Sequence, residues 1–213
     1  MKIILIGYPC SGKGTQAKFI SKKYKIPNIS ISNLLKKEIK KKKNINLIKK
    51  IKNKIKSGKL VPDSIIINLL EKRLKKKDCS IGYILDGFPR TLNQAKIMYK
   101  KNIKIDYVIE ILVSRENIFK RALGRKIHIP SGRTYHKIYN PPLIKNIDNI
   151  TGENLTTRID DTKEIVKKRL NEYDLFQKQI FLFYKKKENI KYFQINGNKK
   201  FKNVKNSIKK ILN

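Results

Sequence analysis

Apolar positions along this chain alternate between short runs and helical repeats. The run from Ile3 to Ile6 ends at Gly7, and a short continuous run of this kind is typical of a strand buried in a parallel sheet. Comparable runs cover residues 83–85, 107–113 and 192–195, with helix-like stretches between them. The alternation predicts a parallel sheet covered by helices, and therefore an α/β fold.

Helical spacing is clearest in two places. Residues 15–24 carry Ala17, Phe19 and Ile20 on one side, so a helix is expected directly after the first strand. From Thr162 onward apolar residues recur at helical spacing and predict one long amphipathic helix. They are Val166, Leu170, Tyr173, Phe176 and Ile180.

Two segments interrupt the alternating pattern. Residues 30–59 are helical in pattern but heavily charged, and they end at Ser57 and Gly58, which predicts a small flap. Residues 122–161 contain repeated turn signals at 130–132, 140–142 and 151–152. A long insertion of this kind predicts a lid or a binding loop.

The length and the cysteine count narrow the class of protein. A chain of 213 residues suits one α/β core with small insertions. The first apolar run is too short for a signal peptide or a membrane span, so a cytoplasmic protein without a membrane partner is expected. Cys10 and Cys79 are the only cysteines, far apart in sequence, and reduced thiols are expected.

The formal net charge of +36 raises nucleic acid as a partner. The positive charge is mostly Lys, spread along nearly every predicted helix, and it is not gathered into Arg-rich runs with aromatic residues. This pattern favours solvated helix faces over a dedicated nucleic-acid site. Nonspecific binding of polyanions at low salt is still expected.

The string GYPCSGKGT at residues 7–15 matches a phosphate-binding loop. Small residues let backbone N–H groups converge on phosphate oxygens, and the helix that follows directs its positive end at them. Lys13 adds a mobile positive charge. The position between a strand and a helix strengthens the interpretation.

The string LDGFPRT at residues 85–91 follows an apolar strand. Because the carboxyl ends of parallel strands form one edge, Asp86 is expected near the phosphate loop, where it would hold the waters of a magnesium ion. Arg90 offers a planar guanidinium for phosphate.

Together these motifs resemble the adenylate kinases with a long lid, over residues 1 to about 200. Further strings occur in the family's order: GKLVPD at 58–63, GRKIHIPSGRTYH at 124–136, NPP at 140–142 and TGENLTTRIDD at 151–161. The resemblance implies a three-layer P-loop kinase fold with a five-stranded parallel sheet flanked by helices. It divides the chain into a core (1–29, 62–123 and 162–213), an AMP-binding flap (30–61) and a lid (124–161).

The resemblance also implies the reaction: reversible phosphoryl transfer from MgATP to AMP, giving two ADP and maintaining adenine nucleotide balance. Magnesium would enter with ATP, and a monomer is the default state. One alternative is a kinase for UMP, CMP or another acceptor, since only the flap reads the base. Another is a nucleic-acid-binding protein that has kept the scaffold and lost efficient turnover.

Site residues follow from matching the motifs position by position. Catalytic roles are expected for Lys13, Asp86, Arg90, Arg121, Arg125, Arg158 and Arg169. ATP is expected to contact Cys10, Ser11, Gly12, Lys13, Gly14, Thr15, Arg125, Thr134, Tyr135 and Lys199. AMP is expected to contact Ile31, Lys36, Lys59, Leu60, Val61, Gly87, Phe88, Pro89, Arg90, Gln94, Arg158 and Arg169, with Gln94 reading the base. Arg at these positions, in a chain dominated by Lys, indicates a need for bidentate contacts.

The flap departs from the family pattern. Relatives commonly have Thr-Gly-Asp and then Arg where this chain has Ile31, Ser32, Asn33 and Lys36. Because Lys meets phosphate as a point charge and Ile has no polar group, AMP binding weaker by about 1–2 kcal/mol is expected.

The phosphate loop and the lid also depart from the family pattern. Cys10 stands where the family usually has Gly, and its thiol is either activated by Lys13 and the helix N-terminus or an inert small side chain. In the lid, His128, Ser131, Asp148 and Thr151 occupy positions where some relatives bind zinc through cysteines. Two hydroxyls are poor zinc ligands, so a hydrogen-bonded cluster without structural zinc is expected.

Overall fold

The computed structural model describes residues 1–41, 45–56 and 60–213. Lys59, one of the expected AMP contacts, and the predicted end of the flap at 57–58 lie outside the described residues.

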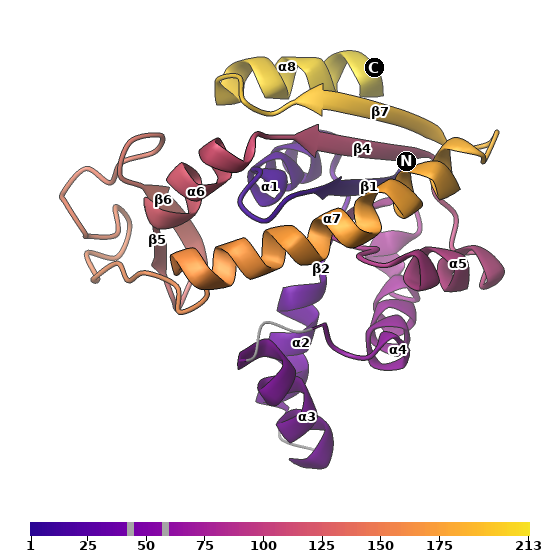
Figure 1. The fold of residues 1–213 in the computed structure, drawn as a ribbon, viewed down its shortest axis with the longest axis horizontal. Coiled ribbons are helices and arrows are strands. Elements are labelled where there is room, and N and C mark those ends of the chain that lie inside the picture. The colour runs from indigo at the N-terminus through magenta and orange to yellow at the C-terminus, as the bar shows by residue number, and fades with distance from the viewer. Residues whose placement is uncertain (42–44, 57–59) are drawn as a thin grey trace.

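A five-stranded parallel sheet forms the centre of the fold (Figure 1). Its order is β2-β3-β1-β4-β7, which confirms the predicted α/β class. The strands are β1 (Lys2–Gly7), β2 (Asn28–Ser30), β3 (Tyr83–Asp86), β4 (Tyr107–Leu112) and β7 (Lys191–Asn196). Leu5 of β1 pairs with Asp86 on one side and with Ile109 on the other. This register brings the phosphate loop and the Asp86 motif to one edge of the sheet.

Helices cover both faces of the sheet because successive residues of each strand point to opposite sides. Ile3 and Leu5 pack with helices α1 (Lys13–Tyr24) and α8 (Phe201–Leu212). Ile4 and Ile6 pack on the other face, against a layer made of α4 (Asp63–Leu74), α5 (Leu92–Lys100) and α7 (Lys163–Lys185). A short 3₁₀ turn, η1 (Lys77–Cys79), precedes β3. Within the described residues no helix has the length and apolar character needed to cross a membrane.

The long helix α7 is tied to the sheet by a buried carboxylate. Glu110, in the middle of β4, is enclosed and accepts hydrogen bonds from Tyr192 Oη at 2.8 Å and Gln194 Nε2 at 2.9 Å on β7. Gln177 Nε2 and Tyr173 Oη of α7 donate to its other oxygen. A buried carboxylate is tolerated when several donors satisfy it, and here those donors fix α7 relative to two strands.

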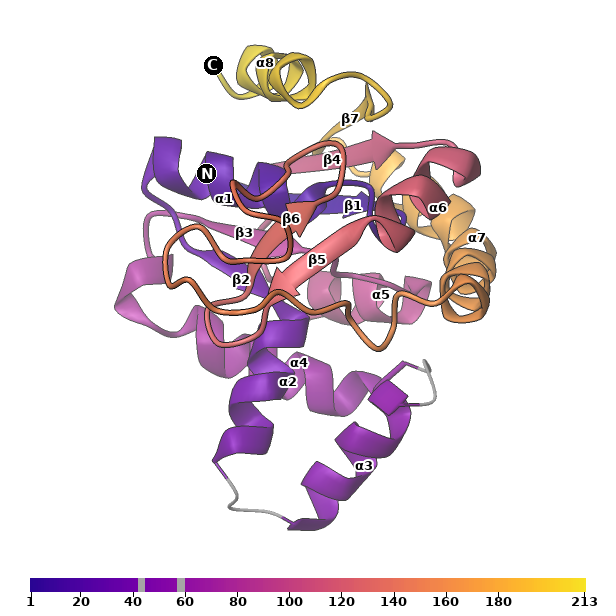
Figure 2. The same cartoon turned by 90° about the vertical axis from the view of Figure 1, so that its left-hand side faces the viewer.

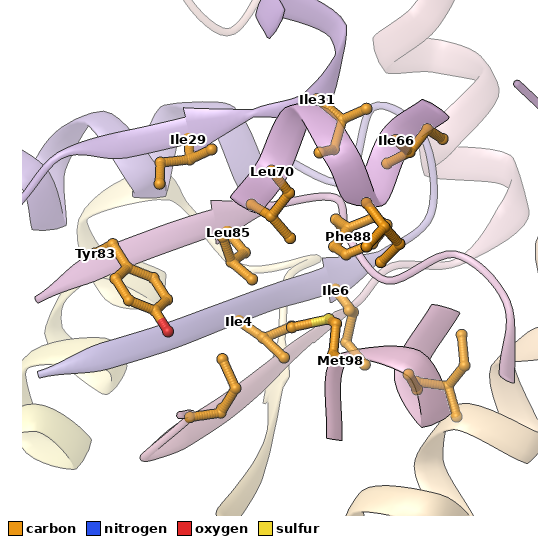
Figure 3. Close-up of a cluster of buried hydrophobic side chains, with 14 of the residues drawn as sticks. Ile4, Ile6, Ile29, Ile31, Ile66, Leu70, Tyr83, Leu85, Phe88 and Met98 are labelled. Atoms are coloured by element: carbon orange, nitrogen blue, oxygen red, sulfur yellow. The ribbon is translucent and has the colours of Figure 1, made fainter. Parts of the chain in front are cut away.

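Between residues 30 and 61 lie helices α2 (Ile31–Lys40) and α3 (Ile45–Lys56), which project away from the sheet (Figure 1). Ile31, Leu35 and Ile51 anchor them in the apolar cluster of the core. Figure 3 places Ile31 in this cluster with Ile66 and Phe88, and Ile31 is only 5% exposed.

Beyond the carboxyl ends of the strands lies an antiparallel hairpin, β5 (Arg125–His128) and β6 (Arg133–His136) (Figures 1 and 2). A loop from 137 to 161 follows it and returns to α7. Helix α6 (Arg115–Leu123) leads into the hairpin and packs against α7 through Ile118, Ala122, Val166 and Leu170. The turn signals in this segment therefore correspond to a hairpin and an irregular loop.

Candidate active site

The phosphate loop connects β1 to α1 through a tight turn. Gly7 has φ +144°, and a Cβ at this position would lie 2.6 Å from the Ile111 carbonyl oxygen, so the close approach to β4 requires glycine. Gly12, with φ +95°, stands directly before α1, and its carbonyl accepts from Thr15 and Gln16 N–H groups at 3.1 Å. The helix therefore begins at the loop, with its first N–H groups directed there.

Lys13 folds back over this loop. Its Nζ donates to the carbonyl oxygens of Gly7 and Tyr8 at 2.7 and 2.6 Å, and lies 3.4 Å from Ser11 Oγ. Burial lowers the pKa of Lys13 to about 8, although the nearby Asp86 carboxylate acts in the opposite direction. The ammonium group is thus held at the loop by neutral oxygens, which an anion could replace.

Cys10 adopts a left-handed backbone with φ +61°. This conformation is natural for glycine and strained for a residue with a Cβ, at a cost of about 1–2 kcal/mol. The loop therefore keeps the shape that glycine would give. Burial raises the pKa of the Cys10 thiol, with Arg125 opposing the rise.

Asp86 and Arg90 lie on either side of a turn that faces Lys13. Asp86 ends β3, and a Cβ on Gly14 would lie 3.4 Å from its Oδ2, which places the carboxylate against the start of α1. Burial raises the pKa of Asp86, while Lys13 and Arg90 oppose the rise. Gly87, with φ +69°, accepts a hydrogen bond from Arg90 Nε at 3.0 Å and lies between Arg90 and Lys13.

Three predicted arginines are held by two adjacent carboxylates. Arg125 makes a bidentate ion pair with the buried Asp161, with its Nε 2.7 Å from Oδ2. Arg158 donates to both oxygens of Asp160 at 2.7 Å, and Arg169 from α7 donates to Oδ2 at the same distance. Burial tends to raise the pKa of Asp160, but Arg158 and then Arg169 outweigh it and hold that pKa below its usual range.

Arg121 connects the phosphate loop to the last strand. Its guanidinium donates to the Ser11 carbonyl at 3.2 Å and to the Gly197 carbonyl at 2.6 Å. The Tyr139 ring of the lid lies over this guanidinium, 5.8 Å from its carbon. Lys199 follows in the same loop as Gly197 and is exposed. Arg121 thus has backbone partners on two sides and an aromatic ring on its face.

Residues expected at the acceptor site fall into two groups. Lys36, like Arg90, is exposed. Ile31, Val61 and Phe88 belong to the core instead, so their side chains stabilise the fold beneath the acceptor site. Pro89 is buried and Leu60 is partly buried.

Gln94 is enclosed, and both ends of its amide are engaged. Its Oε1 accepts from the Arg90 backbone N–H at 2.7 Å and its Nε2 donates to Asp63 Oδ1 at 2.7 Å.

The four lid positions discussed for zinc are joined by hydrogen bonds. His128 Nδ1 lies 2.7 Å from Ser131 Oγ, and Thr151 Oγ1 donates to Asp148 Oδ2 at 3.0 Å. Arg133 donates to both Asp148 oxygens, which holds the pKa of Asp148 well below its usual range. Hydrogen bonds hold these side chains together, and the expectation that no structural zinc binds here stays a prediction.

Sequence reasoning predicted the cations of the site but missed their partners. Asp160, Asp161, Asp63 and Tyr139 were not among the candidates, although the Asp pair lies only two and three residues after Arg158. The Tyr135 side chain, expected at ATP, instead donates to Asp148 inside the lid at 3.0 Å. Thr134 is exposed on the same strand.

A strand, phosphate loop and helix that hold a lysine beside a strand-end carboxylate, with arginines converging from a lid, define the class of P-loop nucleotide kinases. Comparison with known proteins narrows this class. A family model described as adenylate kinase matches residues 5–189. The chain therefore belongs to the adenylate kinase family, and its reaction is the interconversion of ATP and AMP with two ADP.

Full-length relatives agree with the family model. An adenylate kinase of Buchnera aphidicola subsp. Acyrthosiphon pisum is 50% identical over 215 residues, which cover 100% of this chain and 99% of the relative. An adenylate kinase of Photorhabdus laumondii is 45% identical over 100% of both chains. Another, of Buchnera aphidicola subsp. Cinara cedri, is 49% identical over 98% of this chain and 95% of the relative.

The lowered pKa of Lys13 predicts the pH dependence of ATP use. Because only the protonated amine attracts phosphate, kcat/KM for MgATP should fall as pH rises above about 8, the pKa of the free enzyme. Bound phosphate favours the charged form, so kcat should decline only at higher pH. Initial rates from pH 7 to 10 at saturating AMP measure both. A flat kcat/KM up to pH 9.5 would contradict the prediction.

Substitutions at Lys36 and Ile31 should have separate effects, one on the KM for AMP and the other on stability. Lys36→Arg should lower the KM for AMP by about 5-fold to 30-fold, since a guanidinium regains one charged hydrogen bond worth about 1–2 kcal/mol. Ile31→Thr buries a hydroxyl and should lower the free energy of unfolding by about 2 kcal/mol. Ser32→Thr, at an exposed position of the same helix, is the control for the free energy of unfolding. An unchanged KM in Lys36→Arg would refute the idea that Lys at this position weakens AMP binding.

Proposed function

We propose that the chain catalyses this reaction by positioning two nucleotides and surrounding the moving phosphoryl group with fixed positive charge. The main support is the pair of carboxylates, Asp160 and Asp161, that orients Arg125, Arg158 and Arg169 toward one centre. Phosphoryl transfer needs alignment and charge stabilisation and little covalent chemistry from the protein. No general base is part of the proposal.

Each side of the centre has its own task in this proposal. The phosphate loop from Cys10 to Thr15 binds the phosphates of ATP, with Lys13 exchanging its two carbonyl partners for phosphate oxygens. Arg121, Thr134, Tyr135 and Lys199 complete the ATP side. The turn from Gly87 to Arg90, together with Lys36, binds the phosphate of AMP. The bonds of Arg90 to Gly87 and Gln94 support this arrangement because they stiffen the turn.

Magnesium is proposed to accompany ATP. Asp86 fits this role because its carboxylate is partly buried against the start of α1, beside Lys13, and oxygen ligands suit a hydrated magnesium ion. The ion would supply neutralising charge to the phosphates. Asp86 itself would hold and orient the ion's water molecules.

The flap (30–61) and the lid (124–161) are proposed to move relative to the core. Their position in the chain supports this: the lid is inserted between α6 and α7, and the flap between β2 and α4. Closure would bring the lid arginines onto the phosphates and exclude water that would otherwise hydrolyse ATP.

The acceptor preference tests the proposal directly. ADP formation from MgATP should be fast with AMP and slow with UMP, CMP and GMP, because the base is read on the acceptor side. Lys13→Ala should lower the rate about 100-fold or more, since it removes a charge that acts on the phosphates. Coupled assays at moderate salt measure each rate. A preference for another acceptor would indicate a sister kinase.

The same preparation tests two further parts of the proposal. If turnover with every acceptor is negligible, the scaffold has lost catalysis and a binding role takes its place.

A cytoplasmic monomer is proposed, and free Cys10 and Cys79 agree with a reducing compartment. Sedimentation at several protein concentrations would reveal a dimer if one forms.

Nonspecific binding of nucleic acid is proposed for the face made by α1 and α8. Residues 1–37 and 189–213 contain no Asp or Glu. The two helices pack together, and Lys205 Nζ of α8 lies 4.6 Å from the Phe19 ring of α1. The exposed lysines on this face include Lys18, Lys22, Lys23, Lys202 and Lys210. Phosphate backbones bind such surfaces through counterion release.

Charge reversal on this face should weaken RNA binding selectively. The triple variant Lys22→Glu, Lys202→Glu and Lys210→Glu should bind a single-stranded RNA oligomer more weakly. The slope of log Kd against log salt should fall by about 2, because about three phosphate contacts are lost. Fluorescence anisotropy between 50 and 200 mM salt, about the range where such contacts dominate, gives both values. Phosphotransfer should stay unchanged.

A matched control separates this face from total charge. Lys75→Glu, Lys76→Glu and Lys77→Glu make the same charge change at exposed positions after α4. An equal loss of RNA binding in both triple variants would mean that net charge alone matters, and would refute the assignment to this face.

A further inference from the structure

Asp63, the first residue of α4, receives two side-chain hydrogen bonds from the start of α5. Gln94 Nε2 donates to its Oδ1 at 2.7 Å, and Asn93 Nδ2 donates to its Oδ2 at 2.6 Å. The carboxylate therefore connects the end of the flap segment to the helix that follows the Arg90 turn.

The hydrogen bonds of Gln94 determine which way its amide points. A carboxylate only accepts hydrogen bonds and a backbone N–H only donates, so Nε2 must face Asp63 and Oε1 must face the Arg90 N–H. Either partner alone would favour this orientation, and together they exclude the flipped amide. Gln94 is also anchored through its backbone N–H, which donates to Thr91 Oγ1 at 3.1 Å.

The orientation of a glutamine amide decides which base edge it matches. Adenine presents an acceptor at N1 and a donor at its amino group, whereas hypoxanthine presents a donor at N1 and an acceptor at O6. The two edges therefore require opposite amide orientations. After the bonds to Asp63 and Arg90, one N–H and one oxygen lone pair of Gln94 remain for a base.

We propose that Asp63 is a positioning residue that fixes the amide of Gln94 and thereby selects AMP over IMP as acceptor. The inference rests on the proposed role of Gln94 in reading the base. Gln94 is 0% exposed in this structure, so the proposal requires the side chains that cover it to move aside when the acceptor binds. Asp63 acts from behind Gln94 and does not itself contact the nucleotide.

Asp63→Asn tests the proposal with the smallest change in shape. An asparagine amide can donate as well as accept, so it no longer excludes the flipped Gln94. The ratio of kcat/KM for AMP to that for IMP should fall about tenfold, mainly through a higher KM for AMP. The kcat with AMP and the KM for ATP should stay within about twofold, which general damage to the fold would not allow.

Two variants separate this inference from the proposed role of Gln94. Asn93→Ala removes the other donor to Asp63 and should leave the ratio unchanged. Gln94→Ala should raise the KM for AMP; if it does not, Gln94 does not read the base and the proposed function fails at this residue. If Gln94→Ala raises that KM while Asp63→Asn keeps the parental ratio, the positioning role of Asp63 is refuted. Asp63→Glu keeps the carboxylate and should restore part of the discrimination.

Discussion

Mutual repulsion among cations is the constraint on which this site depends. Lys13, Arg90, Arg121, Arg125, Arg158 and Arg169 converge on one edge of the sheet, and like charges in a partly buried place raise the free energy of the fold. Two carboxylates on adjacent residues offset part of this for Arg125 and Arg158 of the lid and Arg169 of α7, since Asp160 holds two of these guanidinium groups and Asp161 holds the third. Lys13 and Arg121 are stabilised differently, by backbone carbonyls. The arrangement keeps the cations in place without neutralising all of them, so an attraction for anions remains.

Sequence reasoning predicted the parts of this arrangement that local strings determine. The strands at 83–85, 107–113 and 192–195 and the long helix from 162 were placed to within about two residues, because each carries a continuous apolar signal. β2, with three residues, is too short for any periodicity, and only the family resemblance supplied a fifth strand. The two strands of the lid hairpin were not predicted, because the frequent turn residues around them interrupt any strand pattern.

Side-chain direction was the part that sequence could not supply. The sequence predicted that Ile31 would face AMP, where its lack of a polar group would weaken binding. In the structure, tertiary packing directs its side chain into the core beside Ile66 and Phe88. Gln94 was predicted to read a base, and its partner Asp63 lies 31 positions away, on another helix. Both facts depend on how α2, α4 and α5 pack against the sheet, which no local string records. Ion partners such as Asp161 were likewise missed: an acidic pair in a turn-rich segment is ordinarily expected at the surface, where an ion pair contributes little, but Asp161 is buried in the fold.

The distribution of acidic residues gives the large positive charge a structural meaning. The chain has 16 acidic residues, and at least nine of them pair with a lysine, an arginine or the N-terminal amine in the described parts of the chain. Glu110 is a tenth with a clear task, since it joins α7 to β4 and β7. Negative charge is therefore concentrated where it orients cations or joins elements, and it is absent from the α1–α8 face. A surface lysine interacts mainly with water and salt, which screen its repulsion within about 8–10 Å, so the excess there is tolerated. Within the active site the same excess would be screened much less, and there Asp160 and Asp161 pair with the arginines.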